Sequence, residues 1–318
     1  MTKRRQPSDT QNCGPPEIDY TKLPAGGLLK TRELPGPTDA KLWNEVLLTV
    51  LPVDVLLLTV EDLEFLSCVS HLNRGYFRSN HGNLGTVYFG KMGTGPTFLK
   101  IAVMKCHSGP LTPGGALITV KNGVEVLRPK AVFCVGFCGG LRKKKVSLGD
   151  VAILAKLRTY SSITTTDNGI QERGLAVPLE RNLLNLIKNA DDGWKAPLKD
   201  SSEVKVWKDG VYLSGPEKVE SEGRREELVK RFPDAIAIEM EGQGLFLAAH
   251  DLKVEWIVIK GVSNFADGKE TEPWKKFASV MAASLTAHIL SNPIRVESAR
   301  GGSDFLAKVG AGVPADVK

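Results

Sequence analysis

The sequence predicts an α/β domain in which helices flank a central mixed β-sheet. Apolar, strand-like runs alternate with amphipathic, helix-like segments along most of the chain. The 318 residues include 32 glycines and 18 prolines, which break the chain into short elements joined by tight turns. A chain of this length with 42% hydrophobic residues can bury a sizeable core.

The two ends of the chain lack this alternation. Residues 1–38 contain glycine or proline every few positions and show no hydrophobic period, so we expect a disordered leader. Residues 292–318 are expected to form a flexible tail. A single folded domain is therefore predicted over residues 39–291.

Strands are predicted where apolar, β-rich runs are bounded by charged or turn-forming residues. The run "VDVLLLTV" is apolar at nearly every position, which is typical of a strand buried on both faces. The predicted strands are 53–60, 85–92, 98–106, 131–138, 150–157, 204–214 and 255–262.

Helices are predicted where apolar residues recur at three- and four-residue steps. A short helix is expected near Asp39, and the final helix begins with Pro273, a residue favoured at the first helical position. The other predicted helices are 114–127, 179–190, 222–231 and 240–251, and the final one extends to 290.

Composition narrows the class of protein. The formal charge of +6 is concentrated in "MTKRR" and "LRKKK"; it is compatible with an anionic ligand but more simply with a solvated surface. The five cysteines show no CxxC or zinc spacing, which predicts reduced thiols, a cytoplasmic protein and no metal site. The apolar run 46–60 is too short and interrupted to cross a membrane, and no signal-peptide pattern precedes it.

Ligand groups in open α/β sheets gather at the carboxyl ends of strands. Four predicted strands are followed by acids, hydroxyls or glycines, in "EDLEF", "HSGPLTPGGA", "GGLRKKK" and "SNFADGKE". The glycine turn "VGFCGG" permits close approach of a ligand, although it also suits an ordinary strand end. The amides of "CHSGPLTPGGA" precede a helix and could bind a phosphate or ribose oxygen.

Taken in this order, "VGFCGG", "VSLGDV", "EMEG" and "VIKGVSNFADG" resemble the purine nucleoside phosphorylase and methylthioadenosine/adenosylhomocysteine nucleosidase superfamily. The resemblance covers about residues 53–290. Residues 235–290 look most like the nucleosidase-type effector domains of immune proteins, some of which cleave adenine from ATP or dATP. The resemblance implies a homo-oligomer that binds a purine nucleoside or nucleotide and needs no cofactor. No basic helix with base-reading side chains supports nucleic acid as a partner.

Cleavage of an N-glycosidic bond needs three groups: a carboxylate for the ribose hydroxyls, a donor to the departing purine and a base that positions water or phosphate. The resemblance implies that Glu241 binds the ribose hydroxyls and Met240 packs under the sugar, and that Glu239 either supports them or contacts the ribose itself. It makes Glu64 the base that activates water, with Glu61 and Asp62 as alternatives.

One position departs from the family pattern. The family has an aspartate after Ser263, whereas this chain has Asn264, whose amide can donate a hydrogen bond but cannot deliver a proton. Three interpretations follow: a slowed enzyme, a binding-only homologue, or an enzyme in which Asp267 substitutes for the missing acid, although Asp267 also suits a structural role.

The remaining positions are assigned by the same resemblance. Residues of the glycine turn and of the loop after 98–106 are expected to face the base, the sugar or a phosphate, and a lysine stands where relatives often place an aromatic or apolar residue. These positions are Phe137, Cys138, Gly139, Ser108, Gly109 and Lys218.

The expected function is a hydrolytic purine N-glycosidase that releases adenine. Glu64 favours water as the nucleophile, and no arginine trio for phosphate is evident. A phosphate-dependent phosphorylase and a catalytically impaired binding module are the alternatives.

Overall fold

The computed structural model describes residues 14–93, 98–141, 145–167 and 169–291. The predicted tail and the first part of the predicted leader lie outside the described residues. Residues 14–38 differ from the expected disorder: they form short 3-10 helices at Tyr20–Lys22, Thr31–Glu33 and Pro37–Asp39. Ile18 and Leu23 are buried, and Ile18 forms a β-bridge with Leu198. Burial of these apolar side chains accounts for the ordered path.

The centre of the molecule is a mixed sheet that has ten strands among the described residues. Its order is β11-β10-β6-β12-β5-β1-β4-β3-β2, and β9 pairs with β6. The strands are β1 (Val55–Thr59), β2 (Phe77–His81), β3 (Gly85–Met92), β4 (Leu99–Lys105), β5 (Ala131–Gly140), β6 (Val151–Thr159), β9 (Ala176–Pro178), β10 (Val206–Ser214), β11 (Ala235–Glu239) and β12 (Glu255–Asn264).

Strands β4, β1, β5 and β12 are mutually parallel, so their carboxyl ends lie at one edge of the sheet. The end of β5 also pairs antiparallel with β11, with Gly139 opposite Ile238 and Gly140 opposite Ala237. This second pairing closes a ring through β5, β12, β6, β10 and β11. It brings the glycine turn beside "EMEG", although the two motifs are far apart in the sequence.

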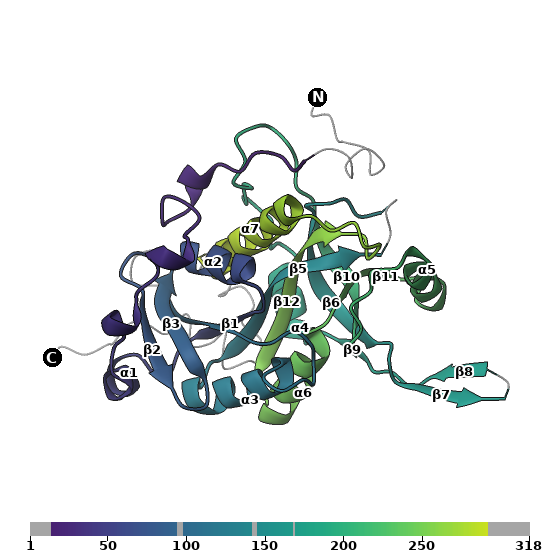
Figure 1. The fold of residues 1–318 in the computed structure, drawn as a ribbon, viewed down its shortest axis with the longest axis horizontal. Coiled ribbons are helices and arrows are strands. Elements are labelled where there is room, and N and C mark those ends of the chain that lie inside the picture. The colour runs from purple at the N-terminus through teal and green to yellow at the C-terminus, as the bar shows by residue number, and fades with distance from the viewer. Residues whose placement is uncertain (1–13, 94–97, 142–144, 168, 292–318) are drawn as a thin grey trace.

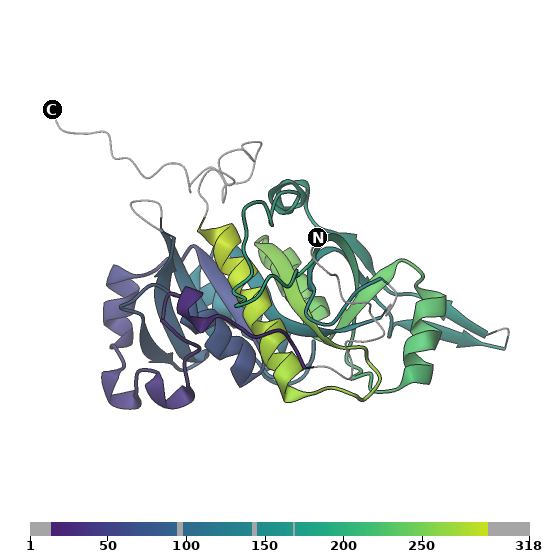
Figure 2. The same cartoon turned by 90° about the horizontal axis from the view of Figure 1, so that it is seen from above.

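Helices cover both faces of the sheet (Figure 1). Helices α2 (Asp62–Ser70) and α7 (Glu272–Leu290) pack together on one face, and α3 (Ala116–Leu127) and α6 (Gly242–Leu252) pack together on the other. The long α7 lies across β12 and β5 (Figure 2). The shorter helices are α1 (Trp43–Thr49), α4 (Arg181–Ile187) and α5 (Glu222–Arg231).

The α/β architecture is the one that the sequence predicts, and each predicted strand corresponds to a strand of the sheet. The sequence analysis did not predict α2, β2, β9 or β11, nor the projecting hairpin of β7 (Ile163–Thr166) and β8 (Gly169–Glu172) (Figure 1). It placed the "EMEG" helix two residues too early, because Glu239 ends β11 and α6 begins at Gly242.

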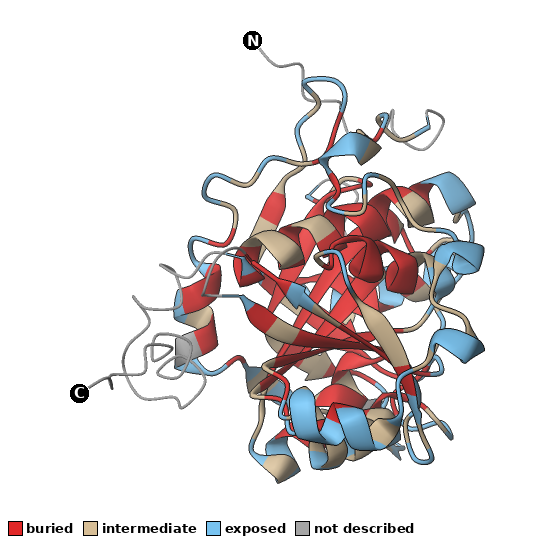
Figure 3. Ribbon diagram, turned by 90° about the vertical axis from the view of Figure 1, so that its left-hand side faces the viewer, coloured by how far each residue is buried: buried red, intermediate tan, exposed pale blue. Residues whose placement is uncertain are grey.

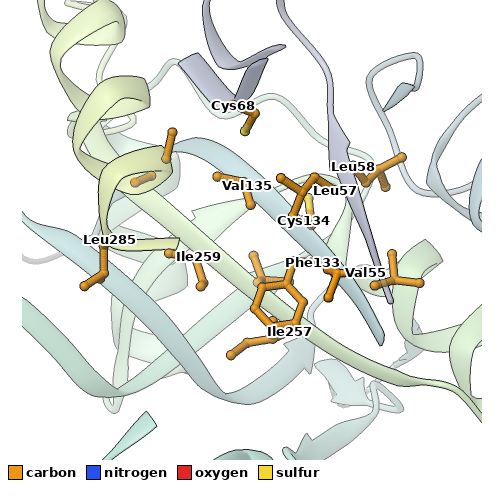
Figure 4. Close-up of a cluster of buried hydrophobic side chains, with 14 of the residues drawn as sticks. Val55, Leu57, Leu58, Cys68, Phe133, Cys134, Val135, Ile257, Ile259 and Leu285 are labelled. Carbon is orange, nitrogen blue, oxygen red and sulfur yellow. The ribbon is translucent and has the colours of Figure 1, made fainter. Parts of the chain in front are cut away.

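The core lies between the central strands and the helices (Figure 3). Val55 and Leu57 of β1, Phe133 of β5 and Ile257 of β12 are fully or almost fully buried and belong to one apolar cluster (Figure 4). Lys260, on β12, is also buried. Because a buried cation is costly without a partner, we expect acidic groups beside it, near the carboxyl ends of these strands.

Candidate active site

A cavity lies where the strand ends meet. Its walls come from the end of β5, from β11 and β12 with the residues that follow them, and from the segments after β1, β4 and β10. Of the residues singled out in the sequence, these line it: Glu61, Glu64, Ser108, Phe137, Cys138, Gly139, Lys218, Glu239, Met240, Glu241 and Asn264. Gly109, Ser263 and Asp267 are not among the lining residues.

Glu64 lies in the first turn of α2 and is 2% exposed. The backbone N–H groups of Val60 and Glu61 donate to its Oε2 at 2.7 and 3.0 Å, and the N–H of Phe137 donates to its Oε1 at 2.9 Å. Gly136 leaves the space that this carboxylate fills, since a Cβ there would lie 1.8 Å from Oε1. The carboxylate is therefore held in one place by the ends of β1 and β5.

The two alternatives to Glu64 are held differently. Glu61 reaches Lys275 at 3.2 Å and Asp62 reaches Lys105 at 2.7 Å, and both carboxylates are about half exposed or more. Only Glu61 of this pair lines the cavity. Of the three acids, Glu64 is the one that is buried and fixed by backbone donors.

Lys260 joins the two central carboxylates. Its Nζ lies 3.2 Å from Glu241 Oε2 and 3.6 Å from Glu64 Oε1, and its side chain is 1% exposed. The sequence analysis treated Lys260 as an ordinary strand residue. The available signal was a single charge within "EWIVIKGV", an otherwise apolar run, since a buried lysine needs acidic partners.

Burial and the neighbouring charges both shift the pKa values of the groups in this cluster. Burial raises the pKa of the Glu64 carboxyl, the positive charge of Lys260 counteracts it, and the negative charge of Glu241 adds to it. Burial alone would lower the pKa of Lys260, but the surrounding acidic groups outweigh it and hold that pKa well above the usual value. The lysine is thus a permanent cation between two acids.

Glu239 supports the backbone that carries Glu241. Its carboxylate accepts from the N–H of Glu241 at 2.9 Å and from the N–H of Gly242 at 3.0 and 2.9 Å. These donors lie at the start of α6, where a negative charge is favourable. Burial and the charge of Glu241 raise the pKa of Glu239.

The loop after β4 contacts "EMEG" from the other side. Gly109 donates its N–H to Glu241 Oε1 at 3.4 Å, and the Ser108 hydroxyl lies 3.8 Å from Met240 Sδ. Gly109 has a φ of +105°, a conformation that favours glycine. Glu241 is therefore held between this loop and Lys260, with its carboxylate at the cavity.

Asn264 ends β12 beside the glycine turn. Its amide Nδ2 donates to Glu270 Oε1 at 2.6 Å and to Ser263 Oγ at 3.0 Å, and its Oδ1 accepts from the N–H of Ala266 at 2.7 Å. Glu270 also lines the cavity, and the sequence analysis did not single it out. Its only signal was an acid within the "SNFADGKE" loop.

Asp267 does not lie at the cavity. Its carboxylate is 1% exposed and lies 3.8 Å from Arg225 of α5. The Arg225 guanidinium also donates to the Phe265 carbonyl at 3.2 Å, so the pair ties the loop after β12 to α5. This geometry favours the structural role over the catalytic one.

Lys218 lies at the cavity wall but is largely exposed, and its Nζ is 2.6 Å from Glu220. Phe137 has the Lys275 ammonium 5.3 Å from its ring centroid.

Among the described residues, no cluster of three His, Cys, Asp or Glu could hold a metal ion. None of the described helices combines the length and apolar character that a membrane crossing requires.

The chain is similar in sequence to known nucleosidases. The chain is 34% identical over 230 residues to a death domain-containing ATP nucleosidase from Amphimedon queenslandica, an alignment that covers 65% of this chain and 42% of the relative. It is 26% identical over 186 residues to a 5'-methylthioadenosine/S-adenosylhomocysteine nucleosidase from Staphylococcus haemolyticus, covering 57% of this chain and 76% of the relative. The chain thus spans less than half of the first relative's length.

Solved structures share the fold. A 5'-methylthioadenosine/S-adenosylhomocysteine nucleosidase from Neisseria meningitidis, in complex with methylthio-immucillin-A, superposes with a TM-score of 0.61 at 20% identity, covering 74% of this chain and 98% of that one. Futalosine hydrolase from Helicobacter pylori gives 0.61 at 18% identity, covering 75% and 97%. The family model of the phosphorylase superfamily matches residues 60–291, most of the chain, and this protein therefore belongs to the phosphorylase superfamily.

Proposed function

We propose that this protein is a hydrolytic N-glycosidase that releases adenine from adenine nucleosides or nucleotides. The observation that carries the proposal is the buried row Glu64–Lys260–Glu241 at the cavity. The names of two relatives agree with it, since one is an ATP nucleosidase and the other a 5'-methylthioadenosine/S-adenosylhomocysteine nucleosidase.

Glu241 would bind the sugar. Its two oxygens are fixed by Gly109 and Lys260, so the carboxylate is presented to the cavity in one orientation. A carboxylate held in this way can accept hydrogen bonds from both ribose hydroxyls. Because these contacts are in place before the reaction, they favour the cationic, oxocarbenium-like sugar that forms as the bond to the base breaks.

Glu64 would activate the attacking water. The gap of 3.6 Å to Lys260 is longer than a hydrogen bond, so Glu64 Oε1 retains a lone pair that a water molecule can use. The water oxygen attacks the anomeric carbon, Glu64 takes a water proton, and the bonding electrons of the glycosidic bond leave with the purine. Lys260 would offset part of the negative charge and hold the two carboxylates at a fixed separation.

Water is favoured over phosphate as the nucleophile. The cations among the described lining residues are Lys218 and Lys260, and each already lies against a carboxylate. A phosphate ion at this cavity would meet several carboxylates and no free arginine among those residues. The phosphate-dependent alternative is accordingly less well supported.

The finer assignments are part of the same proposal. The ATP nucleosidase relative supports a nucleotide such as ATP or dATP as substrate, and its death domain is compatible with an effector role. The buried free thiols of Cys68, Cys106, Cys134 and Cys138 support a cytoplasmic location. The exposed Leu42 and Leu48, on and beside α1, support association into a homo-oligomer.

The test is incubation of the purified protein with adenosine, methylthioadenosine and ATP, with and without phosphate, followed by chromatography. Free adenine without phosphate supports the hydrolase. Adenine that forms only with phosphate, together with ribose 1-phosphate, would show a phosphorylase. Binding of these compounds without base release would leave the binding module that Asn264 suggests.

A further inference from the structure

The amide of Asn264 is hydrogen-bonded to neighbouring residues of the protein. An asparagine side chain has two N–H donors and one carbonyl oxygen. Here the donors reach Glu270 and Ser263, and the oxygen accepts from the N–H of Ala266. Because the backbone N–H of Ala266 can only donate, it fixes which end of the amide is the oxygen. The Asn264 amide can offer a departing purine at most a hydrogen bond, and it has no proton to transfer.

These hydrogen bonds converge on one carboxyl oxygen. Asn264 Nδ2 and Ser263 Oγ both donate to Glu270 Oε1, at 2.6 and 3.0 Å. Glu270 Oε2 takes part in neither of these bonds and lies 3.3 Å from Lys275. The side chain is 18% exposed and belongs to the cavity lining, so it is both held in position and accessible to a ligand.

The other carboxylates that line the cavity have partners of their own. Glu239 is capped by backbone amides, and Glu217 makes a two-oxygen contact with Arg224. Glu64 and Glu241 share Lys260, Glu220 pairs with Lys218, and Glu61 is an exposed acid that shares Lys275 with Glu270. Glu270 differs from all of these because it adjoins the end of β12, where Asn264 pairs with Gly139 of the glycine turn.

Lys275 does not neutralise this region. Its Nζ lies 3.2 Å from Glu61, 3.3 Å from Glu270 and 3.7 Å from Glu272, so one ammonium serves three carboxylates. A purine that covers Glu270 and excludes water would disfavour its charged form and favour a protonated acid beside the base.

We propose that Glu270 is the acid that protonates the departing purine, and that Asn264 and Ser263 position its carboxyl group. As the bond between the anomeric carbon and N9 breaks, its electron pair moves into the purine, and Glu270 transfers its proton to N7. Water supplies the hydroxyl group of the sugar and loses its proton to Glu64. Both carboxyl groups then return to their starting states by exchange with solvent. This assignment rests on the proposed function.

The test compares Glu270→Gln with Glu272→Gln. The first substitution keeps the oxygen that accepts from Asn264 but leaves no proton to transfer. Glu272 contacts the same lysine, its side chain is 76% exposed, and it is not among the lining residues, which makes it the matched control. Each variant is assayed with adenosine, with ATP and with p-nitrophenyl riboside, whose leaving group is stable as an anion.

Loss of an acid is expected to slow adenine release by ~10²–10⁴-fold in Glu270→Gln and to leave nitrophenol release within about threefold. Glu272→Gln is expected to match the unmodified protein on every substrate. Equal losses of Glu270→Gln on both leaving groups would show a structural role, and no loss on either would remove the assignment. No base release from the unmodified protein would remove the proposed function and this assignment together.

A second variant tests the role if nitrophenyl riboside is not cleaved. Asn264→Asp added to Glu270→Gln places a carboxyl group at the end of β12 beside the same edge of the cavity. It is expected to restore adenine release at least about tenfold relative to Glu270→Gln alone. A double variant no faster than the single variant would contradict the role of Glu270 as an acid.

Discussion

The ammonium group of Lys260 lies 3.2 Å from the carboxylate of Glu241, and both side chains are almost completely excluded from solvent. Breaking a buried pair of this kind leaves an uncompensated charge in the interior. The same lysine lies 3.6 Å from Glu64, so its removal would leave two acids facing each other.

Lys260→Met is expected to lower the free energy of unfolding by about 3–5 kcal/mol, the cost of leaving a buried charge without its partner. Urea denaturation followed by circular dichroism measures this change. Lys105→Met is the control, because Lys105 pairs with Asp62 at the surface, where such pairs contribute about 1 kcal/mol or less. Equal effects of the two substitutions would show that Lys260 has no special electrostatic role.

Glu241→Gln is expected to lower kcat/KM for adenine release. The loss should correspond to about 2–4 kcal/mol of activation free energy, the range for one preorganised transition-state contact. Glutamine keeps the length of the side chain and one acceptor oxygen, so the fold should be retained. Glu220→Gln, at the wall of the same cavity, is the control. Full activity of Glu241→Gln in a base-release assay would show that the sugar is bound elsewhere.

Glu64→Ala is expected to abolish hydrolysis while binding of adenosine or ATP survives. Alanine is preferred to glutamine here, because a glutamine NH₂ would face the backbone donors that now bind the carboxylate. Glu61→Ala and Asp62→Ala should retain activity. If Glu64→Ala kept its activity and one of the two neighbouring variants lost it, that neighbour would be the base.

The pH dependence of kcat/KM follows from the state of Glu64. A base must be ionised to accept a proton, and burial raises the pKa of this carboxyl above its ordinary value of 4.5. The rate should therefore fall as the pH is lowered through that raised pKa, at a pH above the ordinary value. A pH–rate profile that stays flat down to pH 4.5 would contradict this assignment.

Asn264→Asp tests whether the unmodified protein lacks an acid. The new carboxyl group would lie beside Glu270, since the amide it replaces is 2.6 Å away, and the two acids would share a proton. With Glu270 already acting as the acid, adenine release at neutral pH should change by less than about tenfold. An acceleration of ~10²-fold or more would show that leaving-group protonation is impaired in the unmodified protein.

The sequence was sufficient for the α/β architecture and for seven strands of the central sheet, because each of those seven is a distinct apolar run. Helix α2 escaped prediction because it is buried from Glu64 to Ser70 and so has no polar face to create a period. Strand β11 escaped because it is five residues long and runs almost directly into α6.

The two site residues that the sequence analysis missed depend on distant partners. The role of Lys260 depends on its contacts with Glu64 and Glu241, which follow other strands. Glu270 lies in a loop without hydrophobic period, and only its contact with Asn264 distinguishes it from neighbouring acids. A pattern along one chain cannot show which charges meet across the sheet.

The most direct test of hydrolysis is a reaction with adenosine or ATP in phosphate-free buffer made with ¹⁸O-water, followed by mass spectrometry of the sugar product. Attack by water at the anomeric carbon predicts one ¹⁸O atom in the sugar for each adenine released, and the same rate when phosphate is added. Release of adenine only in the presence of phosphate, with sugar 1-phosphate as product, would contradict hydrolysis. No adenine release under either condition would contradict the enzymatic function itself.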